Sequence, residues 1–154
     1  MAETTSQPPY DIVIIGGGPA GLTAGMYAAR AAMRTLAIVG EATVSQITVT
    51  DLVENYPGIT GGINGDELVK HFREQAVGFG LETAKADVTA VTPAKWGDRA
   101  GWEVVAGGKR FGAYAVIVAT GATWRRLGVP GEERLIGRGV SFCATCDGPF
   151  HRNR

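Results

Sequence analysis

The sequence predicts an α/β fold in which a βαβ unit carries an inserted antiparallel β meander. Three observations lead to this fold class. An apolar strand at Ile12–Ile15 runs into a glycine-rich turn, an alanine-rich helical stretch follows, and Thr35–Val39 is typical of a second strand. The order strand, glycine turn, helix, strand is a βαβ unit. The two strands should therefore be parallel neighbours joined by a right-handed crossover.

Length and composition are those of a soluble globular protein. With 154 residues, 45% of them hydrophobic, the chain can form one packed domain, or a domain and the start of another. Lys+Arg and Asp+Glu both total 15, so the basic excess expected of a nucleic-acid binder is absent from the sequence. No apolar run approaches the roughly 20 residues of a membrane span. We expect a cytoplasmic protein with neither nucleic acid nor membrane as partner.

After the second strand, the sequence predicts a long loop and a second helix. The stretch 40–62 is irregular, and a loop of this length is usually functional or mobile. Asn64 can cap a following helix, with Glu67 three residues on as in a capping box. Gly78 and Gly80 should end that helix.

The meander is expected next, before a return to the α/β pattern. Its strands are predicted at 86–91, 102–105 and 110–111, the last after the turn Gly107-Gly108. Tyr114–Ala119 is then typical of a buried parallel strand. Val129-Pro130-Gly131 marks a linker, which places a domain boundary between Gly121 and Gly131.

The glycine turn, Gly16-Gly17-Gly18-Pro19-Ala20-Gly21, has the spacing of a dinucleotide-binding motif. Gly16 permits the tight turn, Gly18 lets backbone approach a pyrophosphate, and Gly21 lets helix and strand pack closely. The helix N-terminus then offers N–H groups and partial positive charge to the phosphates. Glu41 is a candidate for the ribose hydroxyls, later than the usual position at the strand end. A tight βα turn without a ligand is the alternative.

A second motif, Cys143-Ala144-Thr145-Cys146-Asp147-Gly148, lies near the end of the chain. Two cysteines at this spacing can form a disulfide and open it by thiol exchange, and a helix start would lower the pKa of the thiolate. Asp147 is well placed to carry a proton to a leaving thiolate. Three alternatives remain open: a zinc site with His151 as a third ligand, two unrelated buried thiols, or a thioredoxin-like motif proper.

Together these motifs are similar to the flavoprotein pyridine-nucleotide disulfide oxidoreductases, and most specifically to the thioredoxin reductase family. The resemblance spans nearly the whole chain after Pro9. It is carried, in the family's order, by the glycine turn, Leu52-Val53-Glu54-Asn55-Tyr56-Pro57-Gly58, Ile117-Val118-Ala119-Thr120-Gly121-Ala122, Gly137-Arg138-Gly139-Val140-Ser141-Phe142, and the dithiol motif.

The resemblance implies FAD bound on a Rossmann-like three-layer unit. The implied FAD contacts are Gly16, Gly18, Pro19, Ala20 and Gly21 at the pyrophosphate, Glu41, Gln46 and Asn55 around ribose and flavin, and Thr120 and Gly121 closing the site. For Asn55 the competing interpretation is an Asx turn ahead of Pro57, and for Gln46 a solvated loop residue.

In the family, hydride passes from NADPH to FAD and then to the disulfide, and the dithiol reduces thioredoxin. By this resemblance Cys146 would meet the flavin, Cys143 would attack the thioredoxin disulfide, and Asp147 would act as acid and base. The implied partner is thioredoxin or a similar disulfide protein, and the full-length family implies a homodimer.

The sequence departs from the family in two respects. Val44 and Ser45 precede Gln46 where the family has two glycines, and the family's second glycine-rich fingerprint and its returning FAD segment do not follow before Arg154. We therefore expect a truncated sequence that lacks NADPH-dependent turnover alone. Its domains would be a flexible N-terminus (1–9), the first part of an FAD-binding domain (10–122), a linker (123–131), and the incomplete start of an NADPH-binding, redox-dithiol domain (132–154). The alternatives are an NADPH-independent dithiol oxidase and a non-catalytic binding module.

Overall fold

The computed structural model describes residues 3–4, 9–41, 45–136, 138–144 and 148. The chain divides into two compact units, Met1–Gly121 and Ala122–Arg154. Among the described residues, no helix has both the length and the apolar character that crossing a membrane requires.

In the described residues, the first unit consists of a seven-stranded sheet, two α-helices and a 3₁₀ helix, and the second unit includes a short helix. The sheet order is β4-β3-β2-β7-β6-β5, with β1 paired to β7. In chain order the elements are β1 (Glu3–Thr4), β2 (Tyr10–Ile15), α1 (Pro19–Arg30), β3 (Thr35–Val39), the 3₁₀ helix η1 (Gln46–Val49), α2 (Gly65–Gly78), β4 (Glu82–Lys85), β5 (Val88–Trp96), β6 (Arg99–Ala106), β7 (Lys109–Val118) and, in the second unit, α3 (Glu132–Leu135).

The predicted α/β fold with an inserted meander is confirmed. β2 pairs in parallel with β3 on one side and with β7 on the other. β5, β6 and β7 are antiparallel neighbours. The strand predicted at Thr35–Val39 has those bounds in the structure.

Two predicted strands, 110–111 and 114–119, are one strand, β7, and their separation was wrong. The first half of β7 is antiparallel to β6, and its second half is parallel to β2. In the sequence, Gly112 suggests that the strand is interrupted there. In the structure it is a buried residue within β7, and the Trp96 indole lies against it. A Cβ on Gly112 would come within 2.6 Å of Trp96 Cζ2.

At the two sheet edges, the structure has more strand residues than the sequence pattern predicts. β4 was not predicted, because three of its four residues are exposed and no apolar run marks it. β5 continues well beyond the predicted 86–91 and includes Pro93. Proline is tolerated there because β5 is the last strand of the sheet.

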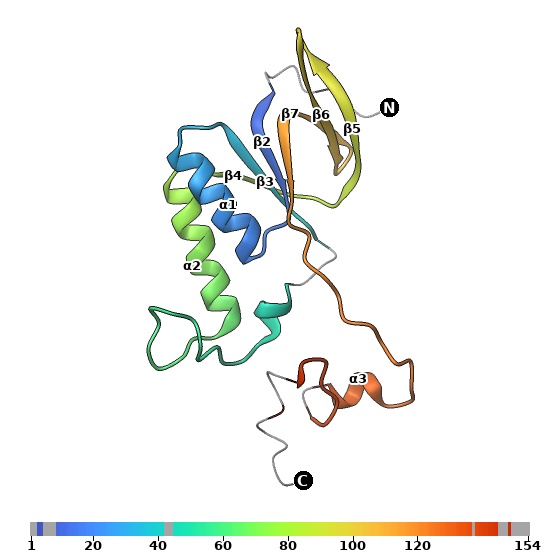
Figure 1. The fold of residues 1–154 in the computed structure, drawn as a ribbon. Coiled ribbons are helices and arrows are strands. Elements are labelled where there is room, and N and C mark those ends of the chain that lie inside the picture. Colours follow the sequence, from blue (N-terminus) through green and yellow to red (C-terminus); the bar gives the residue numbers. More distant parts are fainter. Residues whose placement is uncertain (1–2, 5–8, 42–44, 137, 145–147, 149–154) are drawn as a thin grey trace. The chain divides into compact units, whose positions relative to one another are not determined.

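Three layers enclose two apolar cores. Helices α1 and α2 lie side by side on one face of the parallel strands (Figure 1), where Leu22, Val69 and Ala76 pack against Ile14 and Ala37. On the other face, Val104 and Ala106 of β6 share a cluster with Leu36 and Ile38 of β3. Since β2 and β7 separate β3 from β6 in the sheet order, the meander must curl over the parallel strands.

Helix α2 begins as predicted. The Asn64 side chain accepts hydrogen bonds from the N–H groups of Asp66 (2.9 Å) and Glu67 (3.5 Å), which satisfies two of the donors left free at a helix start. The helix ends at Gly78, and Gly80 follows with a φ of +102°. These contacts anchor the loop that precedes α2.

Within residues 1–9, for which the sequence predicts a flexible N-terminus, Glu3–Thr4 pair in parallel with Lys109 and Arg110 of β7. A pairing of two residues is too short to show a side-chain pattern in the sequence.

The topology defines a candidate binding edge. From β2 the chain moves outward through β3 to β4, and it then returns to place β7 on the other side of β2. The carboxyl ends of β2, β3 and β7 therefore meet where the strand order reverses. In open α/β sheets, ligands bind in the crevice at this switch point.

Candidate functional site

The glycine turn lies at the switch point, and two of its glycines are required by close backbone packing. Gly16 has a φ of +122°, and its Cβ position is filled by the carbonyl of Ala119 at the end of β7. A Cβ on Gly21 would overlap the Gly16 carbonyl and lie 3.3 Å from the Ile14 side chain. The steric reasons predicted for Gly16 and Gly21 thus agree with the structure, while their place beside a pyrophosphate stays a prediction.

Gly18 differs from these two glycines because the space beside it is open. Its backbone is extended, with a φ of −81°, and the nearest atom to a Cβ would be Ser45 Oγ at 3.6 Å. Neither strain nor packing within the described residues explains a glycine here. The open space is where the backbone approach of a ligand, predicted from the motif, would take place.

The turn also presents unused hydrogen-bond donors. Across the part of the chain that the structure describes, no acceptor is found for the backbone N–H groups of Gly17, Gly18, Ala20 or Gly21. Pro19, the first helical residue, has no N–H group to satisfy. Such a helix start is a ready site for an anion. The open Gly18 and these donors together fit a diphosphate, so the residues present are compatible with FAD.

The other residues predicted to contact FAD lie at different distances from the glycine turn. The N–H of Ala119 donates to the Ile15 carbonyl at 2.8 Å, and Thr120 N would lie 3.2 Å from a Cβ on Gly16, with Gly121 the next residue in the chain. Glu41 is exposed two residues after β3, where the side chain of Val39 contacts Gly17.

Gln46 and Asn55 are both exposed. Gln46 begins η1 instead of lying in an irregular loop. Asn55 forms no Asx turn, since none of the described residues hydrogen-bonds its side chain. The ligand contacts predicted for these two residues stay predictions.

In the second unit, Cys143 is disulfide-bonded and half-buried. This excludes a free buried thiol at position 143. Its N–H donates to Ser141 Oγ at 3.1 Å. The predicted Cys146, Asp147 and His151 lie outside the described residues. No cluster of three or more His, Cys, Asp or Glu side chains suited to a metal occurs among the residues that are described.

An aromatic stack that the motifs did not predict adjoins the cysteine. The Phe142 and Trp124 rings are nearly parallel, with centroids 5.1 Å apart and planes 11° apart. The guanidinium of Arg126 lies 5.7 Å from the Phe142 centroid. These contacts tie the residue before Cys143 to the segment that begins the second unit.

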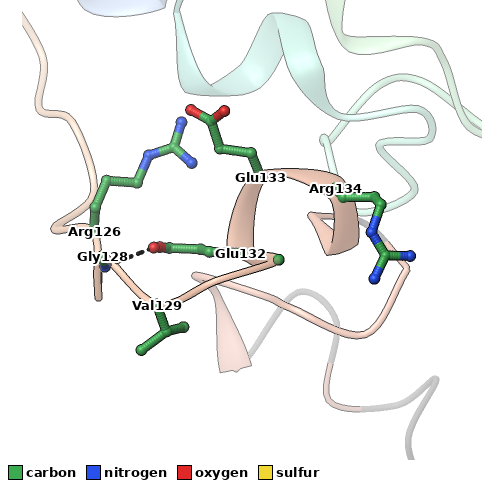
Figure 2. Close-up of a pocket in the computed structure, with 7 residues that line it drawn as sticks. Arg126, Gly128, Val129, Glu132, Glu133 and Arg134 are labelled. Atoms are coloured by element: carbon green, nitrogen blue, oxygen red, sulfur yellow. Dashed lines mark hydrogen bonds between the residues drawn. The ribbon is translucent and has the colours of Figure 1, made fainter.

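A second unpredicted feature is the carboxylate of Glu132, which holds the loop that precedes it through hydrogen bonds. It accepts the N–H groups of Leu127 (3.1 Å) and Gly128 (2.7 Å), the second of which is drawn in Figure 2. Glu132 is 5% exposed. The loop borders an open pocket of about 490 Å³ lined by Arg126, Gly128, Val129, Gly131, Glu132, Glu133 and Arg134, none of which was a predicted site residue. The sequence signal was a glutamate directly after the Pro-Gly turn.

We expect this loop to loosen at acidic pH. The hydrogen bond from Leu127 N–H, followed by that from Gly128 N–H and the nearby Arg126 charge, holds the pKa of Glu132 below its usual value. A lowered folded-state pKa contributes stability above the ordinary glutamate pKa of about 4.3, and that contribution is lost as pH falls through the lowered value. The Leu127 and Gly128 amide resonances should shift together over that acid range. Glu132→Gln should remove the transition and Glu133→Gln should keep it; a transition that persists in Glu132→Gln contradicts the assignment.

Comparison with known proteins finds one family model and several similar relatives that cover nearly the whole chain. A family model described as pyridine nucleotide-disulphide oxidoreductase matches residues 10–154. A thioredoxin reductase of Treponema pallidum is 45% identical over 146 residues, which are 94% of this chain and 46% of the relative. A thioredoxin reductase of Mycolicibacterium smegmatis is 48% identical over 154 residues, covering 98% of this chain and 47% of the relative.

Solved structures show the same similarity. The thioredoxin reductase from Giardia duodenalis aligns with a TM-score of 0.82 at 41% identity, over 93% of this chain and 45% of that one. The chain thus spans about half the length of the curated relatives it matches.

Proposed function

Because this chain belongs to the pyridine nucleotide-disulphide oxidoreductase family, we propose that it serves thioredoxin-disulfide reduction, with FAD as cofactor and NADPH as the electron source. The relatives named thioredoxin reductase support this choice within the family. In this proposal the partner is thioredoxin or a similar disulfide protein, and the reaction takes place in the cytoplasm. The proposal also includes the homodimer that the full-length family implies.

One observation carries the cofactor part of the proposal. The glycine turn combines open space at Gly18 with N–H donors that have no acceptor among the described residues, at the edge where the strand order reverses. A turn built only to connect β2 and α1 needs Gly16 and Gly21 for packing, yet it does not need Gly18. The extra glycine is explained if a diphosphate approaches the backbone there.

In this proposal the chain's own groups bind and orient the cofactor. The N–H groups of the turn hold the diphosphate, and Glu41 accepts the ribose hydroxyls. Gln46 and Asn55 lie along the ribose and flavin, and Thr120 and Gly121 close the site. FAD, when bound, supplies a two-electron carrier between a nicotinamide and a disulfide.

The dithiol carries the second part of the proposal, the reduction of the partner disulfide. Cys143, as thiolate, attacks one sulfur of the partner disulfide, forming a mixed disulfide and releasing one partner thiolate. Cys146 then attacks the Cys143 sulfur, which releases the second partner thiolate and restores the bond between Cys143 and Cys146. Asp147 delivers protons to the leaving thiolates. Cys143 as a residue is half-buried and not enclosed in the core, which is compatible with such an exchange.

The Gly18→Ala variant tests the cofactor site. Alanine adopts a φ of −81° without strain, and among the described residues its Cβ meets only Ser45 Oγ, so the melting temperature should match the parent. The added methyl group lies where the diphosphate must approach, so FAD affinity should fall at least about tenfold, which corresponds to ~1.4 kcal/mol. The measurement is flavin fluorescence titrated with the full chain.

Gly78→Ala is the matched control, because Gly78 ends α2 and a Cβ there would meet nothing within 4 Å in the part of the chain that the structure describes. It should leave both the melting temperature and FAD affinity unchanged. A parent chain that takes up no FAD, or a Gly18→Ala variant that binds as tightly as the parent, contradicts the proposal.

A further inference from the structure

The turn that follows β3 is held from outside by a residue of the β4–β5 connection. The N–H of Glu41 donates to Asp87 Oδ1 at 2.9 Å, across 46 residues of sequence. One residue earlier, the N–H of Ala86 donates to the Val39 carbonyl at 3.0 Å. The two bonds fix the chain on both sides of Gly40, so the direction in which Glu41 leaves the sheet is set by Ala86 and Asp87.

Gly40 is part of the same arrangement. A Cβ on Gly40 would lie 3.2 Å from Asp87 Oδ1, so the carboxylate sits directly against the glycine backbone. This is a close approach that a side chain at position 40 would push back. Val39, just before it, contacts Gly17, for a Cβ on Gly17 would come within 2.6 Å of Val39 Cγ2. The end of β3 thus lies between Asp87 and the glycine turn.

From this geometry we propose that Asp87 is a positioning residue for the adenosine end of the bound dinucleotide. The inference rests on the proposed FAD site. Asp87 does not touch the ligand; it holds the Glu41 backbone so that the Glu41 carboxylate faces the ribose hydroxyls beside the glycine turn. A carboxylate is the group that recognises unphosphorylated ribose hydroxyls at this position of a βαβ unit.

The charges define the ligand class further. Glu41 and Asp87 put two carboxylates at one turn, and a phosphate on the ribose would meet both negative charges. The subsite therefore takes an adenosine with free 2′ and 3′ hydroxyls, as in FAD.

The stability of the chain depends little on the Asp87 contact. Glu41 is exposed, so water replaces the lost acceptor when Asp87 is removed. The effect of removal should appear in ligand binding, because an unanchored turn must be ordered again each time the ribose binds. This separates a positioning role from a purely structural one.

A double-mutant cycle in the full chain tests the proposal. Asp87→Ala and Glu41→Gln should each weaken FAD binding about tenfold. The double variant should bind FAD about as tightly as either single variant, because Asp87 acts through Glu41. Asp87→Asn keeps the Oδ1 acceptor and should restore most of the affinity. Asp98→Ala, in the β5–β6 turn, is the control and should bind as the parent does.

Amide hydrogen exchange of Glu41 in the ligand-free chain gives a second readout. Asp87→Ala should remove its protection while the melting temperature stays within about 2 °C of the parent, as for a surface hydrogen bond. Additive losses in the cycle, or FAD binding unchanged in Asp87→Ala, overturn the role of Asp87 while the proposed function stands. A parent chain that binds no FAD overturns the proposed function, and this inference with it.

Discussion

The Gly16→Ala variant should lose about 3 kcal/mol or more of unfolding free energy, a large part of the 5–15 kcal/mol typical of a domain. Two effects add at this position. A φ of +122° is strained for alanine, at about 1–3 kcal/mol, and the new Cβ would overlap the Ala119 carbonyl, where overpacking costs a further 1–3 kcal/mol. The obstacle is the backbone carbonyl of Ala119, directly after β7; the N–H of Ala119 donates to the Ile15 carbonyl, so this backbone cannot swing aside. Urea unfolding measures the loss.

Two other glycines separate the causes. Gly58 also has a positive φ, +94°, but a Cβ there meets no described residue within 4 Å, so Gly58→Ala should lose only the strain energy, about 1 kcal/mol. Gly18→Ala has neither penalty and should unfold like the parent. If Gly16→Ala proved as stable as Gly18→Ala, the packing of the glycine turn against β7 would be incorrect.

The sequence could predict the features that depend on local spacing. The strand at Thr35–Val39, the Asn64 cap and the parallel pairing of β2 and β3 all follow from apolar periodicity or from residues a few positions apart. The steric demands on Gly16 and Gly21 were predictable for the same reason, since a βα turn of this length brings the same backbone atoms together in every sequence that adopts it.

Features that depend on distant residues could not be predicted. Gly112 suggests a strand end until Trp96 is seen packed upon it, and β4 has no apolar pattern because it is an exposed edge strand. The contact of Asp87 with Glu41 joins residues 46 positions apart. Local patterns carry no signal for such a pair, so the sequence pointed to Glu41 and missed the residue that holds it.

The aromatic stack in the second unit shows the same limit. The dithiol motif drew attention to Cys143 because its spacing has a chemical meaning, whereas Trp124 and Phe142 are ordinary apolar residues in sequence. Their stacking connects Phe142, the residue next to the cysteine, to Trp124 near the start of the second unit. The motif thus pointed to the cysteine that is predicted to react, whereas the aromatic stack beside it became visible only in the structure.

Replacing Cys143 with serine should abolish reduction of a partner disulfide, and replacing Cys146 with serine should instead trap the partner. In the proposed order, Cys143 attacks first, so Cys143→Ser removes the attacking thiolate and the reaction should slow by at least about 10³-fold, as removal of a nucleophile commonly does. Cys146→Ser keeps the attack and removes the thiolate that resolves the mixed disulfide. The covalent adduct through Cys143 should then accumulate.

The measurement uses the full chain, reduced in advance and freed of reductant, mixed with oxidised thioredoxin without NADPH. The parent should release both partner thiols and leave no lasting adduct on a non-reducing gel. Cys146→Ser should give a stable adduct, and Cys143→Ser should give neither adduct nor thiols. The disulfide already formed by Cys143 shows that its sulfur can take part in such bonds. An adduct formed by Cys143→Ser and not by Cys146→Ser would reverse the roles of the two cysteines, because the residue that attacks must be the one left holding the partner.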